Sequence, residues 1–316
     1  MIEGTAEALA AFLKLAAGWL SDRTKRRKPF ITVGYALAAL SRAMISVAGR
    51  WPTVLAARLL DRTGKGLRSA PRDALIGDVT PQAERGRAFG FHRSMDHLGA
   101  LIGPLAATAL LMFWAMKLRT LFLVAVIPAA IGVLMLVVFL REPPHETASS
   151  GSGSADIPRE PLPRPFWGAI ASVAIFYLAN SSDVFLILRA YDVGVAATWI
   201  PLLWAGNHVI KSAFSGRAGA LSDRVGRGVL LVAGWLSYAV IYLVFPFADS
   251  LWMFVVLFVL YAIPFTLSEG PERAWVTDTV PGRVRGKAFG IYYLAVGTFT
   301  LAGTALFGWL YQEVSP

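Results

Sequence analysis

The chain has 316 residues, 56% of them hydrophobic, and its 30 Lys and Arg residues against 20 Asp and Glu residues give a net charge of +10. This apolar fraction is above the usual share of a water-soluble domain, so a soluble enzyme is disfavoured. The sequence contains no cysteine, which excludes disulfides, thiolate metal sites and a cysteine nucleophile.

Apolar runs bounded by Gly, Pro or charged residues predict ten membrane-spanning helices, each close to the roughly 20 residues that a bilayer requires. In chain order they occupy residues 2–20, 30–49, 52–75, 87–113, 121–140, 166–188, 197–218, 228–248, 251–274 and 288–312. The sequence therefore predicts an all-α polytopic membrane protein.

Basic residues gather in alternate loops, as the positive-inside bias of membrane proteins requires. If the loop after residue 20 is cytoplasmic, the inner loops hold Arg23, Lys25, Arg26, Arg27, Lys28, Arg85, Arg87, Arg159, Arg164, Arg224, Arg227, Arg283, Arg285 and Lys287. The outer loops hold Arg50, Lys117, Arg119 and Arg189. This pattern places both termini outside, and the expected setting is the inner membrane of a bacterium. It explains the basic run 25–28 as a topological anchor rather than a nucleic-acid patch.

Residues 142–164 are rich in Pro, Gly and Ser and contain no apolar run, which predicts a flexible cytoplasmic linker. The expected organisation is a five-helix bundle over 1–141, the linker over 142–164, and a second five-helix bundle over 165–316. We expect the chain to be a monomer.

The two halves repeat each other in their loops. The segment GDVTPQAERGRAFG at 77–90 aligns with TDTVPGRVRGKAFG at 277–290, and GWLSDRTKRR at 18–27 aligns with GALSDRVGRG at 219–228. Two similar halves with matched loops are the plan of transporters that rock one bundle against the other around a central site.

These loops resemble the major facilitator superfamily, whose loop between spans 2 and 3 carries G-x-L-x-D-R-x-G-R-R/K. In the first copy Gly18, Leu20, Asp22, Arg23, Arg26 and Arg27 match, with Lys25 in place of a glycine. In the second copy the matching residues are Gly219, Leu221, Asp223, Arg224, Gly226 and Arg227.

Two predicted helices extend the resemblance. Residues 52–75 are similar to the fourth span of the family, with Arg58 at its arginine. Residues 87–113 carry Gly99, Gly103 and Pro104 of the pattern G-x-x-x-G-P, which the family associates with antiporters, although alanines replace its closing glycines. By this resemblance the ten helices are spans 2 to 11 of the usual twelve, and the first and last are lacking.

The resemblance implies two helical bundles related by a pseudo-twofold axis, and secondary transport of a small solute, charged or neutral, by alternating access. It implies proton-coupled efflux or antiport in a lipid bilayer, without cofactor, metal or nucleic acid. The alternative is a truncated or degenerate relative without transport activity. An intramembrane enzyme is disfavoured, because the sequence contains neither H-E-x-x-H nor G-x-S-x-G.

The repeated loops predict a gating motif. Asp22 and Asp223 are expected to hold helix N-termini or arginines in one conformation and release them in the other. Arg85 and Arg285 are the expected ionic partners, while a purely topological role for the arginines stays open. The motif comprises Gly18, Asp22, Arg23, Arg26, Arg85, Gly219, Asp223, Arg224, Arg227 and Arg285.

Charges inside spans predict the substrate and proton pathway, because a charge at bilayer depth is costly and turns toward the protein interior or a wet cavity. These residues are Glu3, Glu7, Lys14, Arg58, Asp61, Lys65, Arg68, His92, Asp96, Asn180, Asp183, His208, Lys211 and Glu269. Glu7 and Asp96 are the predicted proton-coupling groups. The basic stripe on 52–75 suits an anionic substrate, or pairs with acids of neighbouring helices. Asp183 and Lys211 act in transport or form a structural pair. Gly99 and Gly103 are expected to permit close helix packing.

Overall fold

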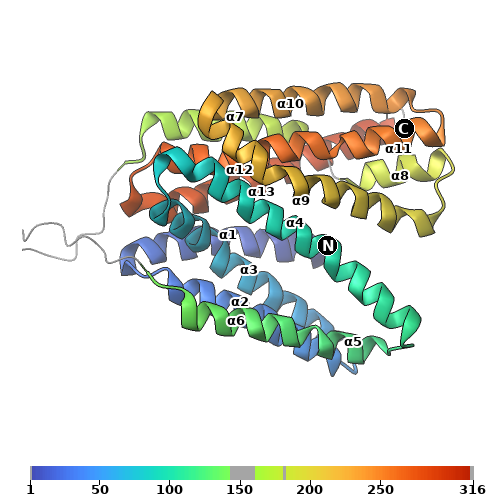
Figure 1. Cartoon of the computed structure of the whole chain (residues 1–316), viewed down its shortest axis with the longest axis horizontal. Coiled ribbons are helices and arrows are strands. Elements are labelled where there is room, and N and C mark those ends of the chain that lie inside the picture. The colour runs from blue at the N-terminus through green and yellow to red at the C-terminus, as the bar shows by residue number, and fades with distance from the viewer. Residues whose placement is uncertain (1, 143–160, 181–182, 314–316) are drawn as a thin grey trace, which may run out of the picture. The chain divides into compact units, whose positions relative to one another are not determined.

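The computed structural model describes residues 2–142, 161–180 and 183–313, and every regular element in these ranges is a helix (Figure 1). The first half contains α1 (Ile2–Thr24), α2 (Lys28–Ser46), α3 (Trp51–Val79), η1 (Gln82–Glu84), α4 (Arg85–Phe113), α5 (Leu118–Val124) and α6 (Val126–Phe139). The second half contains α7 (Arg164–Ala179), α8 (Val184–Asp192), η2 (Ala197–Trp199), α9 (Ile200–Val225), α10 (Arg227–Val244), η3 (Phe245–Phe247), α11 (Leu251–Leu260), α12 (Ala262–Asp278), η4 (Gly282–Val284) and α13 (Arg285–Glu313).

The predicted spans coincide with these helices, and three of them are divided into two pieces: α5 and α6, α7 and α8, and α11 and α12. Proline explains two of the divisions. Pro128 and Pro264 each stand four residues after the last residue of the preceding helix, Val124 and Leu260. Because proline has no N–H, it removes the helical hydrogen bond to the carbonyl four residues earlier.

Seven stretches of the described chain are long and apolar enough to cross a membrane. They are Lys28–Ser46, Gln82–Phe113, Leu118–Phe139, Arg164–Asp192, Arg227–Phe247, Leu251–Asp278 and Gly282–Leu310. The other three predicted spans are α1, α3 and α9, with 23, 29 and 26 residues. These helices are long enough to span, but their hydropathy is lowered by the charges that were predicted to be functional.

The chain folds into two compact units. The first contains Met1–Val79, Ala107–Ile170 and Thr279–Gly297, and the second contains Thr80–Ala106, Ala171–Asp278 and Thr298–Pro316. Each unit thus combines segments from both halves of the sequence, and α4, α7 and α13 contribute to both units. The predicted division into bundles 1–141 and 165–316 stays a proposal, and most of the predicted linker, residues 143–160, lies outside the described residues.

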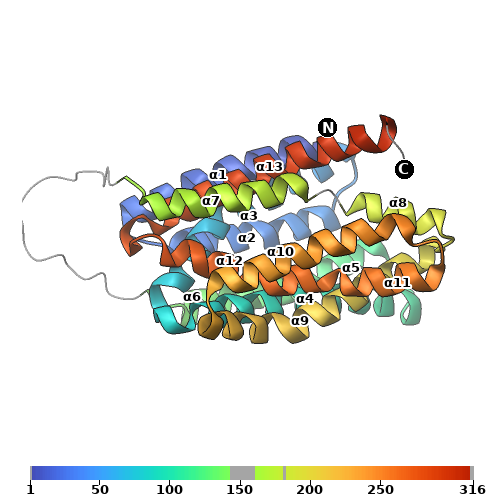
Figure 2. The ribbon, with the colours of Figure 1, turned by 90° about the horizontal axis from the view of Figure 1, so that it is seen from above.

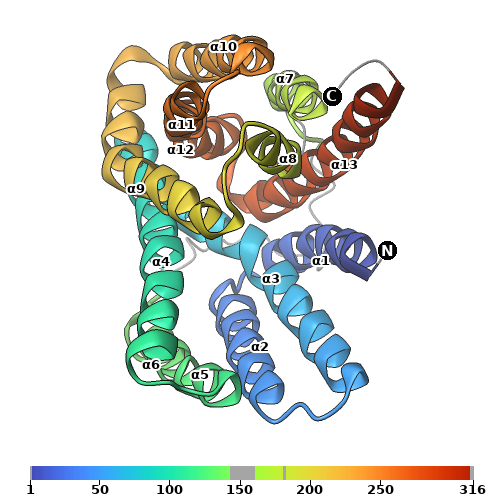
Figure 3. The same cartoon turned by 90° about the vertical axis from the view of Figure 1, so that its right-hand side faces the viewer.

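In the first unit α3 packs between α1 and α2, and α2 also packs against α5 and α6 (Figure 3). In the second unit an aromatic core joins α7, α8, α10, α11 and α12. The rings of Tyr238 and Tyr242 stack with centroids 4.4 Å apart, and Phe176 stacks on Trp235 at 5.3 Å. Tyr261, fully buried at the junction of α11 and α12, belongs to this core. A close-packed core of this kind fixes the helices that carry the polar residues described below.

Candidate functional site

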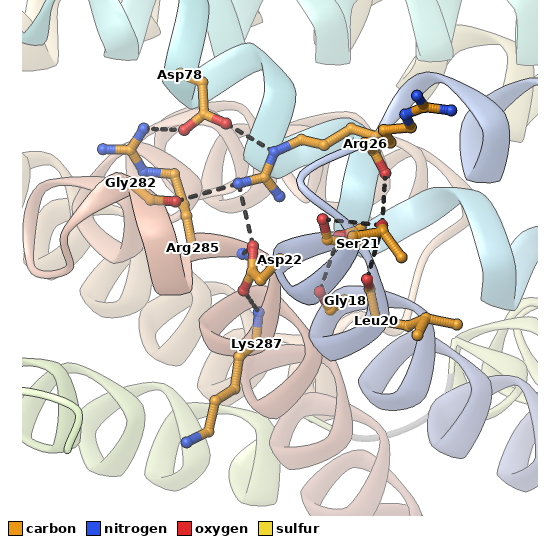
Figure 4. Close-up of polar contacts among 12 residues, drawn as sticks. Gly18, Leu20, Ser21, Asp22, Arg26, Asp78, Gly282, Arg285 and Lys287 are labelled. Atoms are coloured by element: carbon orange, nitrogen blue, oxygen red, sulfur yellow. Dashed lines mark hydrogen bonds and ion pairs between the residues drawn. The ribbon is translucent and has the colours of Figure 1, made fainter. Parts of the chain in front are cut away.

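Asp22, near the end of α1, caps the beginning of α13. The backbone N–H groups of Gly286 and Lys287 donate to its two carboxylate oxygens at 3.0 and 2.7 Å (Figure 4). The first N–H groups of a helix have no partner within the helix and carry partial positive charge, so a carboxylate is favoured there. In Figure 2 the beginning of α13 lies beside α1, where Gly18 meets Gly286. A helix of the first half is therefore bound to a helix of the second half.

Arg27 links this cap to a second acid, Asp78 of α3. Its guanidinium lies 3.2 Å from Asp22 and 2.7 Å from Asp78, and it donates to the carbonyl of Gly282 at 3.2 Å. Arg285 donates to the other oxygen of Asp78. Asp22, Arg27, Asp78 and Arg285 form the first gate cluster. The side chains of Asp22 and Arg27 are each only 7% exposed, so the pair is largely removed from water.

The second unit contains the same arrangement at the beginning of α4. The N–H groups of Gly86 and Arg87 donate to the two oxygens of Asp223, near the end of α9, at 2.9 and 2.8 Å. The guanidinium of Arg227 also contacts Asp223. Again a helix of the second half holds the N-terminus of a helix of the first half.

The ion pairs of the second unit follow those of the first. Arg227 lies 3.1 Å from Asp278, and Arg85 lies 2.7 Å from the other oxygen of Asp278. Arg227 also donates to the carbonyl of Gln82 at 3.1 Å. Asp223, Arg227, Asp278 and Arg85 form the second gate cluster, which matches the first contact by contact.

Glycines allow the paired helices to approach closely at both clusters. A Cβ placed on Gly18 would lie 2.1 Å from the carbonyl oxygen of Gly286, and one placed on Gly219 would lie 2.1 Å from that of Gly86. No side chain fits at such a distance from a backbone atom. These four glycines are therefore required by the geometry of the contacts.

Burial raises the pKa of the Asp22 carboxyl to about 6, and the opposing influences of Arg27 and the two amide N–H groups are smaller. Asp22 lies beyond the predicted span 2–20, at the loop end of its helix. Its carboxylate is mostly ionised at pH 7, so it can act as a charged cap, and it becomes protonated in mild acid.

The structure places some of the predicted gating residues in the two clusters and leaves others exposed. Asp22 and Asp223 accept from the first N–H groups of α13 and α4, and Arg227 pairs with Asp223 and Asp278. Arg85 and Arg285 also lie there, but they pair with Asp278 and Asp78 rather than with the motif aspartates.

Arg26 is exposed, and the residue that matches Arg227 is Arg27. The motif alignment placed Arg26 opposite Arg227 because the first loop differs in length by one residue. Arg23 and Arg224 are also exposed, and the guanidinium of Arg23 lies 5.5 Å from the ring centroid of Trp19.

Asp78 and Asp278 were not among the predicted site residues. A signal for them did exist, because both are identical in the aligned repeats 77–90 and 277–290. Their role as shared acceptors for two arginines follows only from the fold, which brings the ends of α3 and α12 next to those arginines.

The second unit also contains an inner polar network, formed by Arg93, Asp96 and His97 of α4, His208 of α9 and Glu269 of α12. Arg93 pairs with Glu269 and lies 2.9 Å from Asp96. A ring nitrogen of His97 lies 3.2 Å from one of His208, and its other ring nitrogen lies 3.3 Å from Glu269. Adjacent imidazole and carboxyl groups at these distances can pass a proton between them.

Other predicted pathway residues lie in the same unit. Tyr261 donates to Asp183 at 2.6 Å, and the Lys211 ammonium lies 4.2 Å from the ring centroid of Phe265. Lys211 interacts electrostatically with both Asp183 and Glu269. Two further predicted residues lie nearby in the chain: Asn180 is buried at the end of α7, and the Nδ1 atom of His92 lies 3.7 Å from Asp96.

The first unit holds the basic residues of α3. Arg68 donates to the carbonyl of Gly34 at 3.3 Å and lies 4.4 Å from the ring centroid of Tyr35. Lys14 of α1 lies 4.9 Å from the ring centroid of Tyr293, whose hydroxyl donates to the buried Asp73.

The remaining predicted residues of this unit are less constrained. Arg58 is exposed, and Asp61 and Lys65 are half-buried. Glu3 and Glu7 belong to α1, but their side chains lie outside the described part of the structure.

The glycines Gly99 and Gly103 of α4 are both exposed. A Cβ placed on either of them would meet no atom of another segment within 4 Å in the described structure. Pro104 is within the same helix, which continues through it to Phe113. The predicted packing role of these residues stays a prediction.

Comparisons with known proteins cover the whole chain. The family profile described as Major Facilitator Superfamily matches residues 4–208 and, in a second match, 170–316. An uncharacterized MFS-type transporter of Methanocaldococcus jannaschii is 30% identical, over 100% of this chain and 80% of its own length. The tetracycline resistance protein, class C, of Escherichia coli is 25% identical over 92% of this chain and 75% of its own. The crystal structure of the human organic anion transporter MFSD10 superposes with a TM-score of 0.77 at 16% identity, over 99% of this chain and 78% of that one.

Proposed function

The chain belongs to the Major Facilitator Superfamily, and from this premise we propose that it moves a small solute across the membrane by alternating access, coupled to protons. Membership makes the protein an integral membrane transporter of a solute rather than an enzyme. The coupling ion, the direction of transport and the class of solute are the parts that we propose.

The duplicated gate clusters carry the proposal. Each cluster fastens a helix of one half to a helix of the other, through an aspartate on two helix N–H groups and an arginine bridge. A side-chain cap is worth about 0.5–2 kcal/mol, so such contacts can form in one state and break in the next. In alternating access, both clusters close one entrance and separate when that entrance opens.

The inner polar network supports coupling to protons. We propose that a proton moves between Glu269, His97 and His208, and that the pairing of Arg93 with Glu269 is exchanged when the proton arrives. A chain of acid and imidazole groups within a span is typical of proton relays in transporters. Asp96, which pairs with Arg93, and Glu7 of α1 remain proposed coupling groups.

Efflux by antiport is the proposed direction. It is supported by the pattern formed by Gly99, Gly103 and Pro104 and by the similarity to a tetracycline resistance protein.

The proposed solute is small and carries charge, since basic residues of α3, including Arg58 and Arg68, and acids of the second unit suit charged groups. The proposed setting is a bacterial inner membrane, with the gate clusters on the cytoplasmic side, both ends of the chain outside and a monomeric protein.

A flux experiment on the full chain in proteoliposomes tests the proposal. Trapped pyranine reports the internal pH while tetracycline or single organic anions are added on one side. We expect a solute-dependent proton flux that is lost in Glu269→Gln and reduced in Asp22→Ala and Asp223→Ala. Asp192→Asn, which neutralises an exposed acid, is the matched control and should keep the wild-type flux.

Two outcomes would contradict parts of the proposal. Solute movement that ignores the pH gradient in the wild type would remove proton coupling. Unchanged flux in both Asp22→Ala and Asp223→Ala would remove the gating role. If folded wild-type protein moves no solute of the panel in either direction, the alternative of a relative without transport activity is favoured.

A further inference from the structure

An open groove of about 650 Å³ runs between α4 and α9 in the second unit. Two arginines line it, Arg87 in the first turn of α4 and Arg217 of α9, together with Glu84 of η1. Two cations against one anion make the groove positive. It lies outside the inner polar network, and the gate clusters use only the backbone N–H of Arg87.

Both guanidinium groups are available to an external anion. Arg87 and Arg217 are exposed, and no carboxylate in the described part of the chain forms an ion pair with either of them. The Arg217 guanidinium lies against an aromatic ring, 5.6 Å from the centroid of Phe214. Arginine binds phosphate oxygens through several donors in a fixed fork, and therefore suits a phosphodiester better than a point charge does.

The floor of the groove is apolar and continues into the membrane-spanning part of α4. Phe91 and Met95 line it and are 60% and 45% exposed, together with alanines of both helices. At about 1.5 Å per residue, Met95 lies about 12 Å along α4 from Arg87. A ligand that fits this surface has an anionic head at the loop end and an apolar tail along the helix.

The repeat shows that this chemistry belongs to one unit only. By the offsets of the repeated loops, Lys287 stands opposite Arg87, but Ala16 stands opposite Arg217. The two serines that line the groove, Ser94 and Ser212, have Leu294 and Ala11 as counterparts. If these residues served only the packing of the helices, the first unit would have them too. The second arginine and the two serines are therefore specific to the groove of the second unit.

We propose that this groove binds a phospholipid with an anionic headgroup, its phosphate held by Arg87 and Arg217 and an acyl chain lying over Phe91 and Met95. Basic pockets between membrane helices bind anionic lipid heads, and each basic residue near the surface strengthens such binding by about a factor of five. The tail distinguishes a lipid from a soluble phosphate, because only a lipid covers the exposed Phe91 and Met95. The inference does not depend on the proposed transport function.

Native mass spectrometry of the detergent-purified full chain tests the proposal. Phosphatidylglycerol and phosphatidylcholine with the same acyl chains are added at equal concentration, and the bound lipids are counted. We expect preferential retention of phosphatidylglycerol, weakened about fivefold by Arg87→Gln or Arg217→Gln and about thirtyfold by both together. The matched control is Lys287→Gln, which removes the corresponding cation of the other unit and should leave the retention unchanged.

A second variant separates binding from folding. Arg87→Lys with Arg217→Lys keeps both charges and should retain most of the phosphatidylglycerol, whereas Ser212→Trp fills the groove and should displace it. Equal retention of the two lipids by the wild type would overturn the proposal, and so would unchanged retention in the double glutamine variant. Displacement of the bound lipid by an equal concentration of glycerol 3-phosphate would show that the head alone is recognised and would overturn the assignment to a lipid.

Discussion

At the scale of single residues, Asp22 combines two tasks that a shorter or neutral side chain could not combine. One carboxylate accepts two backbone N–H groups of α13 and also meets the guanidinium of Arg27. Asparagine could keep part of the cap, but it has only one acceptor oxygen and no charge. Hydrogen bonds to a charged group are worth more than neutral ones, which explains why an acid occupies this position in both repeats.

The raised pKa of Asp22 makes this contact sensitive to pH. Burial lifts the pKa to about 6 from the value of 3.8 that the group has in water. The folded state then binds more protons than the unfolded state between these values, so the contribution of Asp22 to stability is largest below pH 4 and is lost as the pH rises through 6. We expect the thermal midpoint of the wild type, relative to that of Asp22→Asn, to rise when the pH is lowered from 7 to 4. A relative midpoint that falls over this interval would contradict the assignment.

The backbone conformation of Lys25 leads to a second prediction at this scale. Its φ is +53°, a left-handed conformation, at the place where the family motif has glycine. Such a conformation destabilises the folded state by about 1–2 kcal/mol when the residue has a side chain. Replacement by glycine removes this strain, but glycine is more flexible in the unfolded chain, which offsets roughly 0.5–1 kcal/mol of the stabilisation.

We therefore expect Lys25→Gly to stabilise the protein by up to about 1.5 kcal/mol, seen as a higher thermal midpoint in detergent. The neighbouring Arg26, which has no positive φ, is the control. Arg26→Gly should lower the midpoint or leave it unchanged, and an equal gain in both variants would exclude backbone strain as the cause.

At the scale of helices, the approach of α1 to α13 and of α9 to α4 depends on glycine pairs. At Gly18 and Gly219 an added methyl group would lie 2.1 Å from a carbonyl oxygen of the partner helix, so the helices must move apart to accept alanine. Overpacking of this kind costs typically 1–3 kcal/mol. The cost falls on the state in which the gate clusters are formed.

We expect Gly18→Ala and Gly219→Ala each to lower the thermal midpoint and to increase the labelling of a cysteine placed at the buried Ala17 or Ala218. The native chain has no cysteine, so such labelling needs no background correction. Gly99→Ala is the control, because no atom of another segment lies within 4 Å of the added methyl group in the described structure. It should be neutral or slightly stabilising, since alanine favours helices by up to about 1 kcal/mol. Equal destabilisation by all three variants would contradict the role of the close contacts.

At the scale of the whole molecule, the same cluster occurs once in each compact unit. The first cluster consists of Asp22, Arg27, Asp78 and Arg285, the second of Asp223, Arg227, Asp278 and Arg85, and no residue is shared. Each fastens a helix of the first half of the sequence to a helix of the second. A conformational change that separates the halves must therefore release both clusters.

Sites that share no partner usually contribute additively to stability. We expect Arg27→Gln and Arg227→Gln each to shift the population toward the released state, and the double variant to shift it by the product of the two factors. Labelling of cysteines at Ala17 and Ala218 measures the two contacts separately. If one substitution exposes both cysteines fully and the second adds nothing, the clusters act as a single cooperative gate and additivity fails.

The sequence by itself determined the helical membrane fold, the order and approximate limits of the spans, and the family. The cause is that hydropathy and charge act locally: about twenty apolar residues must form a helix in lipid, whatever their neighbours are. The repeat in the sequence also identified Asp22 and Asp223 as candidate site residues, since a motif shared by two loops is visible in the amino-acid sequence.

Only the tertiary structure decided which groups meet. It showed that Arg27, and not Arg26, lies in the first gate cluster, and that Asp78 and Asp278 are the acceptors for Arg285 and Arg85. It also showed that four residues of three helices meet in the inner polar network: Arg93, His97, His208 and Glu269. These contacts join residues more than 100 positions apart in the chain or depend on a shift of one residue in a loop. Ion pairs and hydrogen bonds act over a few ångströms in space, so the local pattern of a sequence does not record them.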